Sequence, residues 1–364
     1  MRICLITPEF PERGPSFGIG TYVSALRSGL IQAGDQVLTV VANHLGIDYL
    51  DHNGDWSHTP PTAGPACLRA ALLPRRATDR IEKFDPDIVE SSNWHGLGAF
   101  LRGSGKRIVR LSTPARIEAR WASGKARLTL PVFHSWEKTA VISAHVLIAD
   151  SSAMDSVGES IYGRRADFII PHGLAPQAPQ QTEARNTPNL NLLSVGRCEA
   201  RKGTDLLLAA WPHIRKQHPT ASLHIVGKDP HGWALRMSQI DSSICYHGVI
   251  PNTALSELRS RCCIQIVPSR FESFGLVVLE AWANGLPVIA CTGGALPEVI
   301  GTAGVICQPN ASSLAHSVGK LLSSQTTQQR LARDGEQRLQ QRFSLTQWID
   351  HNRHCYRQAV RNAR

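Results

Sequence analysis

The run Pro268-Ser-Arg-Phe-Glu272-Ser-Phe-Gly-Leu-Val-Val-Leu-Glu280-Ala-Trp282 decides the fold of this chain. An apolar strand, Cys263–Val267, leads into it, and a helix follows its glycine. In open α/β sheets, ligands bind at the carboxyl ends of strands, and Glu272 stands at such an end. Glu280 falls in the second turn of the helix among apolar residues, so its carboxylate needs hydrogen-bond donors. Ribose hydroxyls would serve, and so would donors from the protein itself.

Short apolar strands alternate with longer helical segments along the chain, which predicts parallel α/β architecture. The chain has 364 residues, more than the roughly 250–300 at which one hydrophobic core stops growing. Each half opens with a strand, a glycine-containing loop and a helix, which favours two doubly wound domains. The predicted strands are Ile3–Ile6, Val37–Val41, Ile88–Glu90, Arg107–Leu111, Val146–Ala149, Phe168–Ile170, Leu192–Val195, Ser222–Val226, Ile244–Tyr246, Cys263–Val267, Pro287–Ala290 and Val305–Cys307.

The domain boundaries follow from the same alternation. We expect a first domain over residues 1–172 and a second over 173–343. Residues 344–364 have a helical period and are expected to cross back to the first domain. The segment Gln177–Asn189 is rich in proline, glutamine and threonine, has no hydrophobic period, and is the predicted linker.

Other strand ends also carry candidate binding residues. Arg197 can form a bidentate pair with a phosphate, and Lys202 offers a point charge ahead of a helix. Gly18 and Gly20 lie in a predicted loop before a helix over about 21–33, where backbone can approach an anion closely. Taken alone, a basic surface loop and a tight turn explain these features equally well. The loop Thr292–Glu298 follows another strand and is either part of the site or structural.

The formal charge is +10, and much of it is clustered in the first half. Such a surface fits nucleic acid, an anionic membrane, phosphate-bearing small molecules or a plain solvated face. The basic residues are not interleaved with stacking aromatics, which disfavours nucleic acid. The clustered residues are Arg69, Arg75, Arg76, Arg80, Arg102, Lys106, Arg107, Arg110, Arg116, Arg120, Lys125 and Arg127.

The chain begins with an apolar run that is too short for a signal peptide. No stretch approaches the roughly 20 apolar residues of a membrane-spanning helix. We therefore expect a cytoplasmic protein. The nine cysteines contain no C-x-x-C pair, so a zinc ribbon is disfavoured and buried reduced thiols are expected.

The whole arrangement resembles the retaining glycosyltransferases of family 4, also called group 1, which have the GT-B fold. The Glu-x7-Glu signature of that family matches Glu272 and Glu280. Matching runs are Gly18-Ile-Gly-Thr-Tyr-Val23, Ile170-Pro-His-Gly173, Val195-Gly-Arg197, Lys202-Gly203, Gly248-Val-Ile-Pro251, Val267-Pro-Ser-Arg270, Gly285-Leu-Pro-Val288, Gly293-Gly-Ala-Leu-Pro-Glu298 and Phe343-Ser344. The resemblance covers nearly the full chain and is most specific over residues 192–300.

The resemblance implies two Rossmann-like domains facing a central cleft, a nucleotide diphosphate sugar as donor, and transfer with retention of anomeric configuration. The donor would lie mainly on the second domain, and the acceptor, a saccharide, lipid-linked saccharide or small molecule, on the first. No metal or other cofactor is expected. Such an enzyme of polysaccharide biosynthesis would stay in the cytoplasm and contact the inner face of an anionic membrane peripherally.

The resemblance also implies roles for individual residues. Arg197 and Lys202 would hold the donor diphosphate and stabilise the departing nucleotide. Glu272 would contact the transferred sugar, and Glu280 the ribose hydroxyls. The remaining substrate contacts would come from Gly18, Gly20, Val249, Phe274, Gly275 and Leu276, largely through backbone.

Two departures bear on catalysis. Many relatives carry a second glycine where Phe17 stands, and a histidine where Ser112 stands in the run Arg110-Leu-Ser-Thr-Pro114. Serine offers a hydroxyl but no imidazole, so a contact to the sugar from this position is in question. His95 would partly compensate, but core or loop packing is the favoured interpretation of this residue. His172 precedes Gly173 at the predicted domain junction, where a structural role in a loop is favoured.

Several rival functions remain open on sequence alone. A nucleotide-sugar epimerase or an α-glucan phosphorylase would share the fold but not the combined set of Arg197, Lys202, Glu272 and Glu280. A binding protein that keeps the fold with little or no transfer is favoured only by Ser112. An oxidoreductase would need G-x-G-x-x-G directly after the first strand, and this chain lacks it. Asp85-Pro-Asp87 has the D-x-D form of some metal sites, but it precedes a strand as a turn would.

Overall fold

The computed structural model describes residues 1–13, 18–43, 46–60, 76–101, 103–122, 124–175 and 190–362. The chain divides into two compact units. Unit 1 contains Met1–His172 and Leu345–Arg364, and unit 2 contains Gly173–Ser344. The predicted linker, Phe17, Arg69, Arg75 and Arg102 lie outside the described residues. Within the described ranges, none of the helices combines the length and the apolar character required to cross a bilayer.

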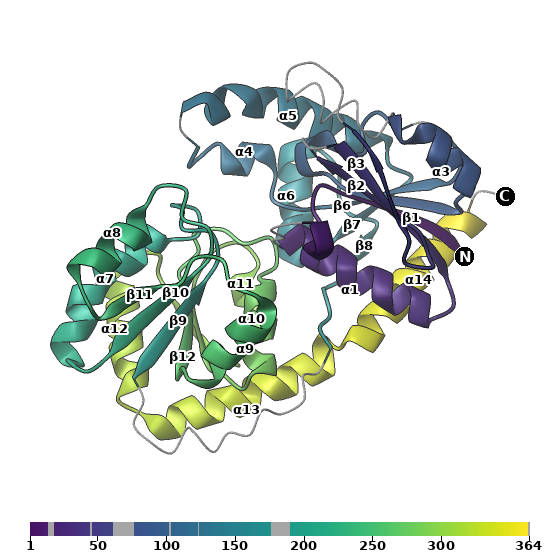
Figure 1. Cartoon of the computed structure of the whole chain (residues 1–364). Coiled ribbons are helices and arrows are strands. Elements are labelled where there is room, and N and C mark those ends of the chain that lie inside the picture. Colours follow the sequence, from purple (N-terminus) through teal and green to yellow (C-terminus); the bar gives the residue numbers. More distant parts are fainter. Residues whose placement is uncertain are drawn as a thin grey trace. The chain divides into compact units, whose positions relative to one another are not determined.

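Unit 1 is built on an eight-stranded sheet of order β4-β3-β2-β1-β5-β6-β7-β8 (Figure 1). Strands β1, β2 and β5 to β8 are parallel, whereas β3 and β4 pair antiparallel at one edge. The strands are β1 (Arg2–Thr7), β2 (Gln36–Asn43), β3 (Gly46–Leu50), β4 (Trp56–Thr59), β5 (Ile88–Ser92), β6 (Lys106–Arg110), β7 (Val146–Ala149) and β8 (Phe168–Ile169). The central strands are buried on both faces, as parallel strands covered by helices are.

Helices cover the unit 1 sheet. They are η1 (Pro11–Arg13), α1 (Gly18–Gln32), α3 (Thr78–Phe84), η2 (Trp94–Gly96), α4 (Ala115–Glu118), α5 (Gly124–Ser143), α6 (Ser152–Tyr162) and α14 (Leu345–Arg361). Local signals fix their ends. In α6 the Ser151 hydroxyl accepts a hydrogen bond from the Met154 amide, and Gly163 ends the helix with a left-handed φ of 76°.

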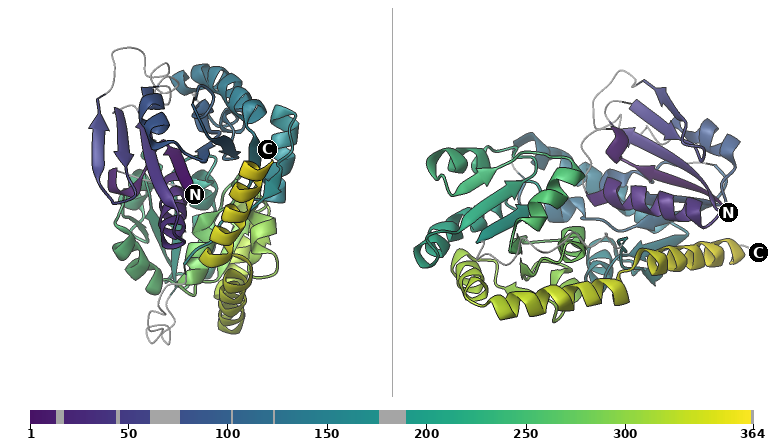
Figure 2. Two further views of the ribbon diagram at one scale, coloured as in Figure 1. Left: turned by 90° about the vertical axis from the view of Figure 1, so that its right-hand side faces the viewer. Right: turned by 60° about the horizontal axis from the view of Figure 1, so that its bottom comes forward.

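The C-terminal helix α14 packs on unit 1 beside α1 (Figure 2). The Ile349 side chain of α14 packs directly on Gly29 of α1, where an added Cβ atom would come within 2.4 Å of it. The apolar side of α14 is buried, including Trp348, Ile349 and Tyr356. Helix α14 is therefore an integral layer of unit 1.

A buried polar network joins α14 to the sheet. Arg110 Nε donates to Glu90 Oε1 at 2.9 Å, and Arg110 Nη2 donates to Asn352 Oδ1. The Tyr356 hydroxyl donates to Glu90 Oε2 at 2.5 Å. All four side chains are at most 3% exposed. Arg110 therefore belongs to the interior, and its assignment to a basic surface cluster was wrong.

Unit 2 is built on a six-stranded sheet of order β11-β10-β9-β12-β13-β14, parallel throughout. Its strands are β9 (Asn191–Val195), β10 (Ser222–Val226), β11 (Ile244–Tyr246), β12 (Ile264–Val267), β13 (Val288–Cys291) and β14 (Val305–Cys307). Its helices are α7 (Thr204–Gln217), α8 (Trp233–Ile240), α9 (Asn252–Ser260), α10 (Leu276–Ala283), α11 (Leu296–Ile300), α12 (Ala311–Leu322) and α13 (Gln325–Arg342).

The predicted strands all form, and the prediction missed β3 and β4. These two short strands contain Asp48 and His58, whose charged or polar side chains interrupt the apolar run that indicates a strand. The predicted loop at Gly18 and Gly20 was also wrong, because both glycines lie in the first turn of α1. Asp85, by contrast, ends α3 with a left-handed φ of 48°, as a turn residue would.

Candidate functional site

The loops that follow three strands of unit 2, β9, β12 and β13, are in close contact at the carboxyl edge of its sheet. A Cβ atom on Gly203 would lie 1.9 Å from the Pro268 carbonyl oxygen. One on Gly294 would lie 2.1 Å from the backbone carbonyl oxygen of Glu272. Gly203 and Gly294 have left-handed φ angles of 72° and 62°. Only glycine combines that conformation with such close backbone contact. These glycines therefore gather the side chains of separate loops into one site.

Glu272 and Lys202 form a close ion pair at this edge. Lys202 Nζ lies 2.6 Å from Glu272 Oε1 and 2.9 Å from Oε2, and the Ser269 hydroxyl donates to Oε1 at 2.7 Å. Glu272 is 6% exposed. Burial raises its pKa, but Lys202, Arg201 and the Ser269 hydroxyl together lower it more, so the net pKa is below the ordinary value. The carboxylate is therefore ionised and held in a fixed orientation.

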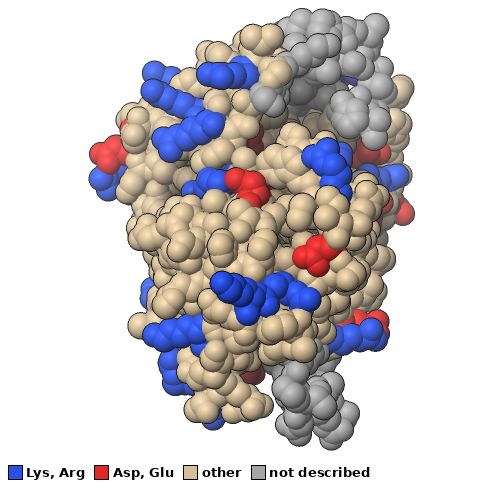
Figure 3. All heavy atoms as spheres, turned by 90° about the vertical axis from the view of Figure 1, so that its left-hand side faces the viewer, with Lys and Arg blue, Asp and Glu red and all other residues tan. Residues whose placement is uncertain are grey.

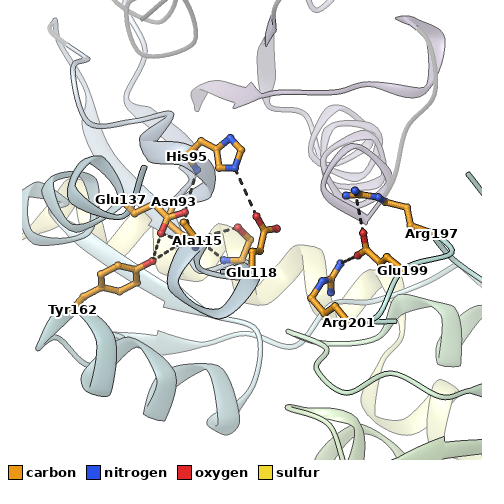
Figure 4. Close-up of polar contacts among 10 residues, drawn as sticks. Asn93, His95, Ala115, Glu118, Glu137, Tyr162, Arg197, Glu199 and Arg201 are labelled. Carbon is orange, nitrogen blue, oxygen red and sulfur yellow. Dashed lines mark hydrogen bonds and ion pairs between the residues drawn. The ribbon is translucent and has the colours of Figure 1, made fainter. Parts of the chain in front are cut away.

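A second charged group lies on the loop between β9 and α7. Glu199 Oε2 lies 3.0 Å from Arg197 Nη2, and Oε1 accepts from Arg201 Nη2 at 2.9 Å. In Figure 4 the carboxylate of Glu199 lies between the two guanidinium groups. The Arg197 side chain is 44% exposed, whereas that of Arg201 is 12% exposed. Of these two cations, Arg197 is the one that an incoming anion reaches more easily.

Glu199 and Arg201 were not among the site residues predicted from the sequence. The only signal was an acid between two arginines in a strand-end loop. Arg201 also donates to the Phe271 carbonyl at 3.3 Å, so it ties its loop to the loop of Glu272. Arg270 reinforces this tie with two hydrogen bonds of 2.7 Å to the Asp205 carboxylate. The charged loop is thus braced on the side away from Arg197.

Glu280 lies on α10 and has a protein donor. Arg259 Nη2 lies 2.5 Å from Glu280 Oε2, and the Glu280 side chain is 25% exposed. Of the two donors that the sequence left open, ribose or protein, the protein one is therefore present. No other described residue donates to the second oxygen, Oε1. Half of the carboxylate remains available to a ligand.

The remaining predicted contacts in unit 2 offer backbone more than side chain. Gly275 caps α10 with a φ of 100°, and Leu276 begins the helix. The Phe274 side chain is buried, with its ring centroid 5.7 Å from that of Phe343. Val249 is 58% exposed after β11. Gly293 and Ala295 hydrogen-bond the backbone of Glu272, so the loop Thr292–Glu298 supports that residue.

In unit 1 the first turn of α1 already carries a carboxylate. The Gly20 amide donates to Glu9 Oε1 at 3.0 Å. A helix N-terminus attracts anions because its amides are unpaired and its dipole is positive there. The Glu9 carboxylate therefore lies where the sequence predicted that backbone at Gly18 and Gly20 would receive an anion.

Ser112 is part of a hydrogen-bonded cluster at the carboxyl edge of the unit 1 sheet. Its amide and its hydroxyl both donate to Asn93 Oδ1, at 2.6 and 3.0 Å. Asn93 donates to the Tyr162 hydroxyl at 3.0 Å, and Tyr162 donates to Glu137 Oε2 at 2.7 Å (Figure 4). The serine hydroxyl is therefore engaged with a loop that also carries His95.

Glu137 is the centre of that cluster. Its carboxylate accepts hydrogen bonds from the amides of Ala115, at 3.0 Å, and His95, at 3.2 Å. Burial raises the pKa of Glu137 to about 7, against the opposing effect of the Tyr162 hydroxyl and of those amides. His95 has a left-handed φ of 50° and is stacked between Trp94 and Phe133. One buried carboxylate thus fixes a strained loop and the start of α4.

His172 is an interior residue. It is 4% exposed, stacks on Tyr22, and lies with Nε2 3.5 Å from Asp150 Oδ2. Burial lowers its pKa despite Asp150. These contacts fit the structural interpretation of this histidine.

The charge of unit 1 is partly displayed at its surface. Arg76, Arg80, Arg116, Arg120 and Arg127 are exposed. Figure 3 shows a face of the molecule on which lysine and arginine side chains outnumber the acidic ones. Within the described residues, no group of three or more histidine, cysteine, aspartate or glutamate side chains is arranged to hold a metal ion.

Comparisons with known proteins find a glycosyl transferase domain in the second half of the chain. The model of the family described as "Glycosyl transferases group 1" matches residues 189–324, which hold the charged loops of unit 2. A glycogen synthase of Mycobacterium tuberculosis is 28% identical, over 94% of this chain and 91% of its own length. A GDP-mannose-dependent alpha-(1-6)-phosphatidylinositol monomannoside mannosyltransferase of Mycolicibacterium smegmatis is 26% identical over 88% of each chain.

Solved structures agree on the fold. A sucrose-phosphate synthase from Thermosynechococcus elongatus has a TM-score of 0.82 at 20% identity and covers 98% of each chain. The catalytic domain of Starch Synthase IV from Arabidopsis thaliana, bound to ADP and acarbose, has a TM-score of 0.73 at 15% identity. It covers 98% of this chain and 99% of its own. The chain therefore carries a group 1 glycosyl transferase domain over residues 189–324 and has the GT-B fold.

Proposed function

We propose that this glycosyltransferase moves a sugar from a nucleotide diphosphate sugar to an acceptor hydroxyl with retention of anomeric configuration. One observation carries the proposal: Lys202, Glu272 and the half-exposed Arg197 lie on braced strand-end loops of unit 2. A diphosphate leaving group needs cations where its charge develops, and fixed cations cost no reorganisation during the reaction. Retention in the absence of an assigned enzyme nucleophile corresponds to displacement on the same face of the sugar.

In this proposal Arg197 and Lys202 bind the diphosphate and stabilise it as it departs. The Lys202 ammonium then shares its three donors between phosphate and Glu272. Glu272 accepts hydrogen bonds from hydroxyls of the transferred sugar while Ser269 and Lys202 hold its orientation. Its net lowered pKa keeps it an acceptor at neutral pH.

The other donor contacts are backbone and ribose contacts. Amides at Phe274, Gly275 and Leu276 face the sugar and phosphate at the start of α10, the base lies near Val249, and Glu280 binds the ribose. On unit 1, we propose that backbone at Gly18 and Gly20 binds an anionic group of a substrate, in the position that the Glu9 carboxylate holds at the helix start. The proposal needs no metal.

A panel of donors tests this function. ADP-glucose, UDP-glucose and GDP-mannose are compared by thermal shift and by slow donor hydrolysis, since the relatives differ in donor. We expect at least one to raise the melting temperature and to be hydrolysed with an α-anomeric product detected by NMR. The proposal fails if neither these sugars nor their free nucleotides stabilise the protein. A β-anomeric first product refutes retention alone.

A binding protein with little turnover is the second candidate, and the engaged hydroxyl of Ser112 favours it. A single-turnover experiment with a tightly bound donor separates the two. If donor binds but is neither hydrolysed nor transferred to any saccharide, the binding protein is supported. If Ser112→His increases turnover without changing donor affinity, the missing imidazole limits a real transferase.

The acceptor is a glycan or a lipid-linked saccharide, and we propose that the enzyme meets it at the inner face of an anionic membrane. Helix α5 supplies the contact. Leu128, Val132 and Ile142 are 78%, 45% and 52% exposed. Arg127 and Lys138 are exposed on the same helix, whose described exposed positions include no acid. Apolar insertion and attraction to anionic lipid act together on such a surface.

Flotation with phosphatidylglycerol vesicles, against phosphatidylcholine vesicles, tests this contact. We expect salt-sensitive binding that Leu128→Ser with Val132→Ser abolishes. The matched control replaces two exposed apolar residues of α8 in unit 2, Leu235→Ser with Ile240→Ser, which are 48% and 79% exposed. Equal loss in both double variants, or no binding by the wild type, refutes the membrane contact.

A further inference from the structure

Helix α9 of unit 2 carries an arginine that points into the interior. Arg259 is 4% exposed, although the helix around it is mostly polar. Transfer of a guanidinium from water into a protein costs several kcal/mol unless the charge is paired and its donors are satisfied. The partners of Arg259 therefore indicate what the buried charge is for.

Arg259 reaches two separate elements. Its Nη2 atom lies 2.5 Å from Glu280 Oε2 on α10, and its Nε donates to Gln265 Oε1 on β12 at 3.2 Å. Gln265 is fully buried and passes the contact on, because its Nε2 donates to the Val277 carbonyl at 2.7 Å. Arg259 of α9 thus contacts the Glu280 side chain of α10 directly and reaches the first turn of α10 through Gln265 of β12.

This arrangement constrains one carboxylate oxygen of Glu280, Oε2, more than the other. A glutamate on a helix has several rotamers, and a side chain that is 25% exposed can sample them. The planar guanidinium is itself held by Gln265, so it fixes Oε2 in one place. Oε1 is left without a donor among the described residues. Two vicinal hydroxyls, such as the 2′ and 3′ hydroxyls of a ribose, can then donate to a preorganised acceptor.

Stability alone does not account for the pair. Buried ion pairs can often be replaced by apolar residues without loss of stability, so folding alone does not require an arginine at this position. Glu280 lies on α10, the helix that directly follows the loop of Glu272. We infer that Arg259 is a positioning residue that holds Glu280 for a ribose diol and so sets the preference for ribonucleotide over deoxyribonucleotide donors. This inference rests on the proposed function.

The test compares ligands as well as variants. The affinity of ADP, GDP or UDP, whichever binds the wild type most tightly, is measured by calorimetry beside its 2′,3′-dideoxy form. We expect Arg259→Ala to weaken the ribonucleotide about ten-fold, the order expected for a lost charge-assisted hydrogen bond. The dideoxy form has no diol to lose, so its affinity should stay within about two-fold of wild type.

Three further variants separate positioning from general support. Glu280→Ala should show the same pattern, and adding Arg259→Ala to it should cause no further loss. Arg259→Lys, which keeps the buried charge and covers a failure of the alanine variant to fold, should fall between wild type and alanine. The control is Arg261→Ala, two residues away, whose ion pair with Glu257 is exposed, at 65% and 63%; its ligand affinities should not change.

The outcomes are distinct. If Arg259→Ala weakens both nucleotides equally, or if its effect adds fully to that of Glu280→Ala, Arg259 is only structural and the inference is wrong. If Arg259→Ala leaves both affinities unchanged, the inference is also wrong. If no nucleotide binds the wild type, the proposed function itself has failed, which is a different result from either.

Discussion

Glu90 and Arg110 form an ion pair at 2.9 Å in unit 1, and Glu272 and Lys202 form one at 2.6 Å in unit 2. The first pair is sealed: its side chains are 2% and 1% exposed, and Tyr356 takes the remaining oxygen of Glu90. The second pair is open on one side, because the Lys202 side chain is 24% exposed. Similar chemistry at similar distance thus occurs in two different settings.

The difference separates a fold-forming network from a site. Every partner in the first network is protein, and one comes from α14, so the network attaches the C-terminal helix to the sheet. In the second, an exposed ammonium can exchange part of its contact with Glu272 for a ligand anion. A sealed pair should therefore affect unfolding, and an open pair should affect binding and turnover.

The largest effect should come from breaking the sealed pair. Arg110→Ala leaves Glu90 buried without its cation, which typically destabilises a protein by about 3–5 kcal/mol. Urea unfolding followed by circular dichroism measures this loss. The control Arg330→Ala removes an exposed pair with Asp334 and should change stability by less than about 1 kcal/mol. Equal effects of the two substitutions would mean that burial is irrelevant here.

Breaking the open pair should affect chemistry instead. Lys202→Ala removes a cation from the proposed diphosphate site, and loss of one such donor typically lowers turnover by about 10²–10³-fold. The loss of stability should be smaller than for Arg110→Ala, because Glu272 lies at the edge, where water can reach the space left by the lysine. Steady-state kinetics with the donor found in the panel, together with urea unfolding, measures both. Full activity in a folded Lys202→Ala protein removes Lys202 from the proposed site.

A third carboxylate, Glu137, should make part of the stability of unit 1 depend on pH. Its pKa is raised to about 7 in the folded chain, whereas a glutamate in an unfolded chain titrates at about 4.3. Between these values the folded state holds a proton that the unfolded state has lost. The contribution of Glu137 is therefore complete below about pH 4.3, falls by about 3–4 kcal/mol as pH rises to about 7, and is constant above.

Unfolding free energies at pH 5 and pH 8 test this sign. The wild type should be relatively more stable at pH 5 when each value is compared with Glu137→Gln, which does not titrate. His95→Ala serves as a second comparison, since it changes the stacked ring and keeps the carboxylate. A difference between wild type and Glu137→Gln that grows with pH would contradict the raised pKa.

The sequence predicted the frame of the molecule because apolar runs such as Ile264–Val267 are long enough to mark buried parallel strands. It failed where a strand is short and polar, as in Trp56–Thr59, and where glycines open a helix at Gly18. Motifs identified Glu272 and Lys202 as candidate site residues. Their direct contact joins residues that are 70 positions apart in the sequence, so the motifs did not predict it. Glu199 and Arg259 went unnoticed because neither belongs to a motif and their partners are fixed only by tertiary packing.

The smallest expected effect concerns Glu199, and its direction sharpens the contrast between open and sealed pairs. Glu199 neutralises Arg197 and Arg201 from within the loop. Glu199→Gln removes that negative charge while keeping the size of the side chain. If the loop is an anion site, ADP or UDP should bind about two- to five-fold more tightly, the modest change expected of a half-exposed charge. The gain should shrink as salt rises to about 0.5 M, because exposed charges are screened. Glu257→Gln frees Arg261 in the same manner but away from the strand-end loops, so it should leave nucleotide affinity unchanged. Weaker binding in Glu199→Gln would instead mean that Glu199 orients Arg197 for the phosphate, and the pair would then resemble Glu90 and Arg110 more closely than its exposure implies.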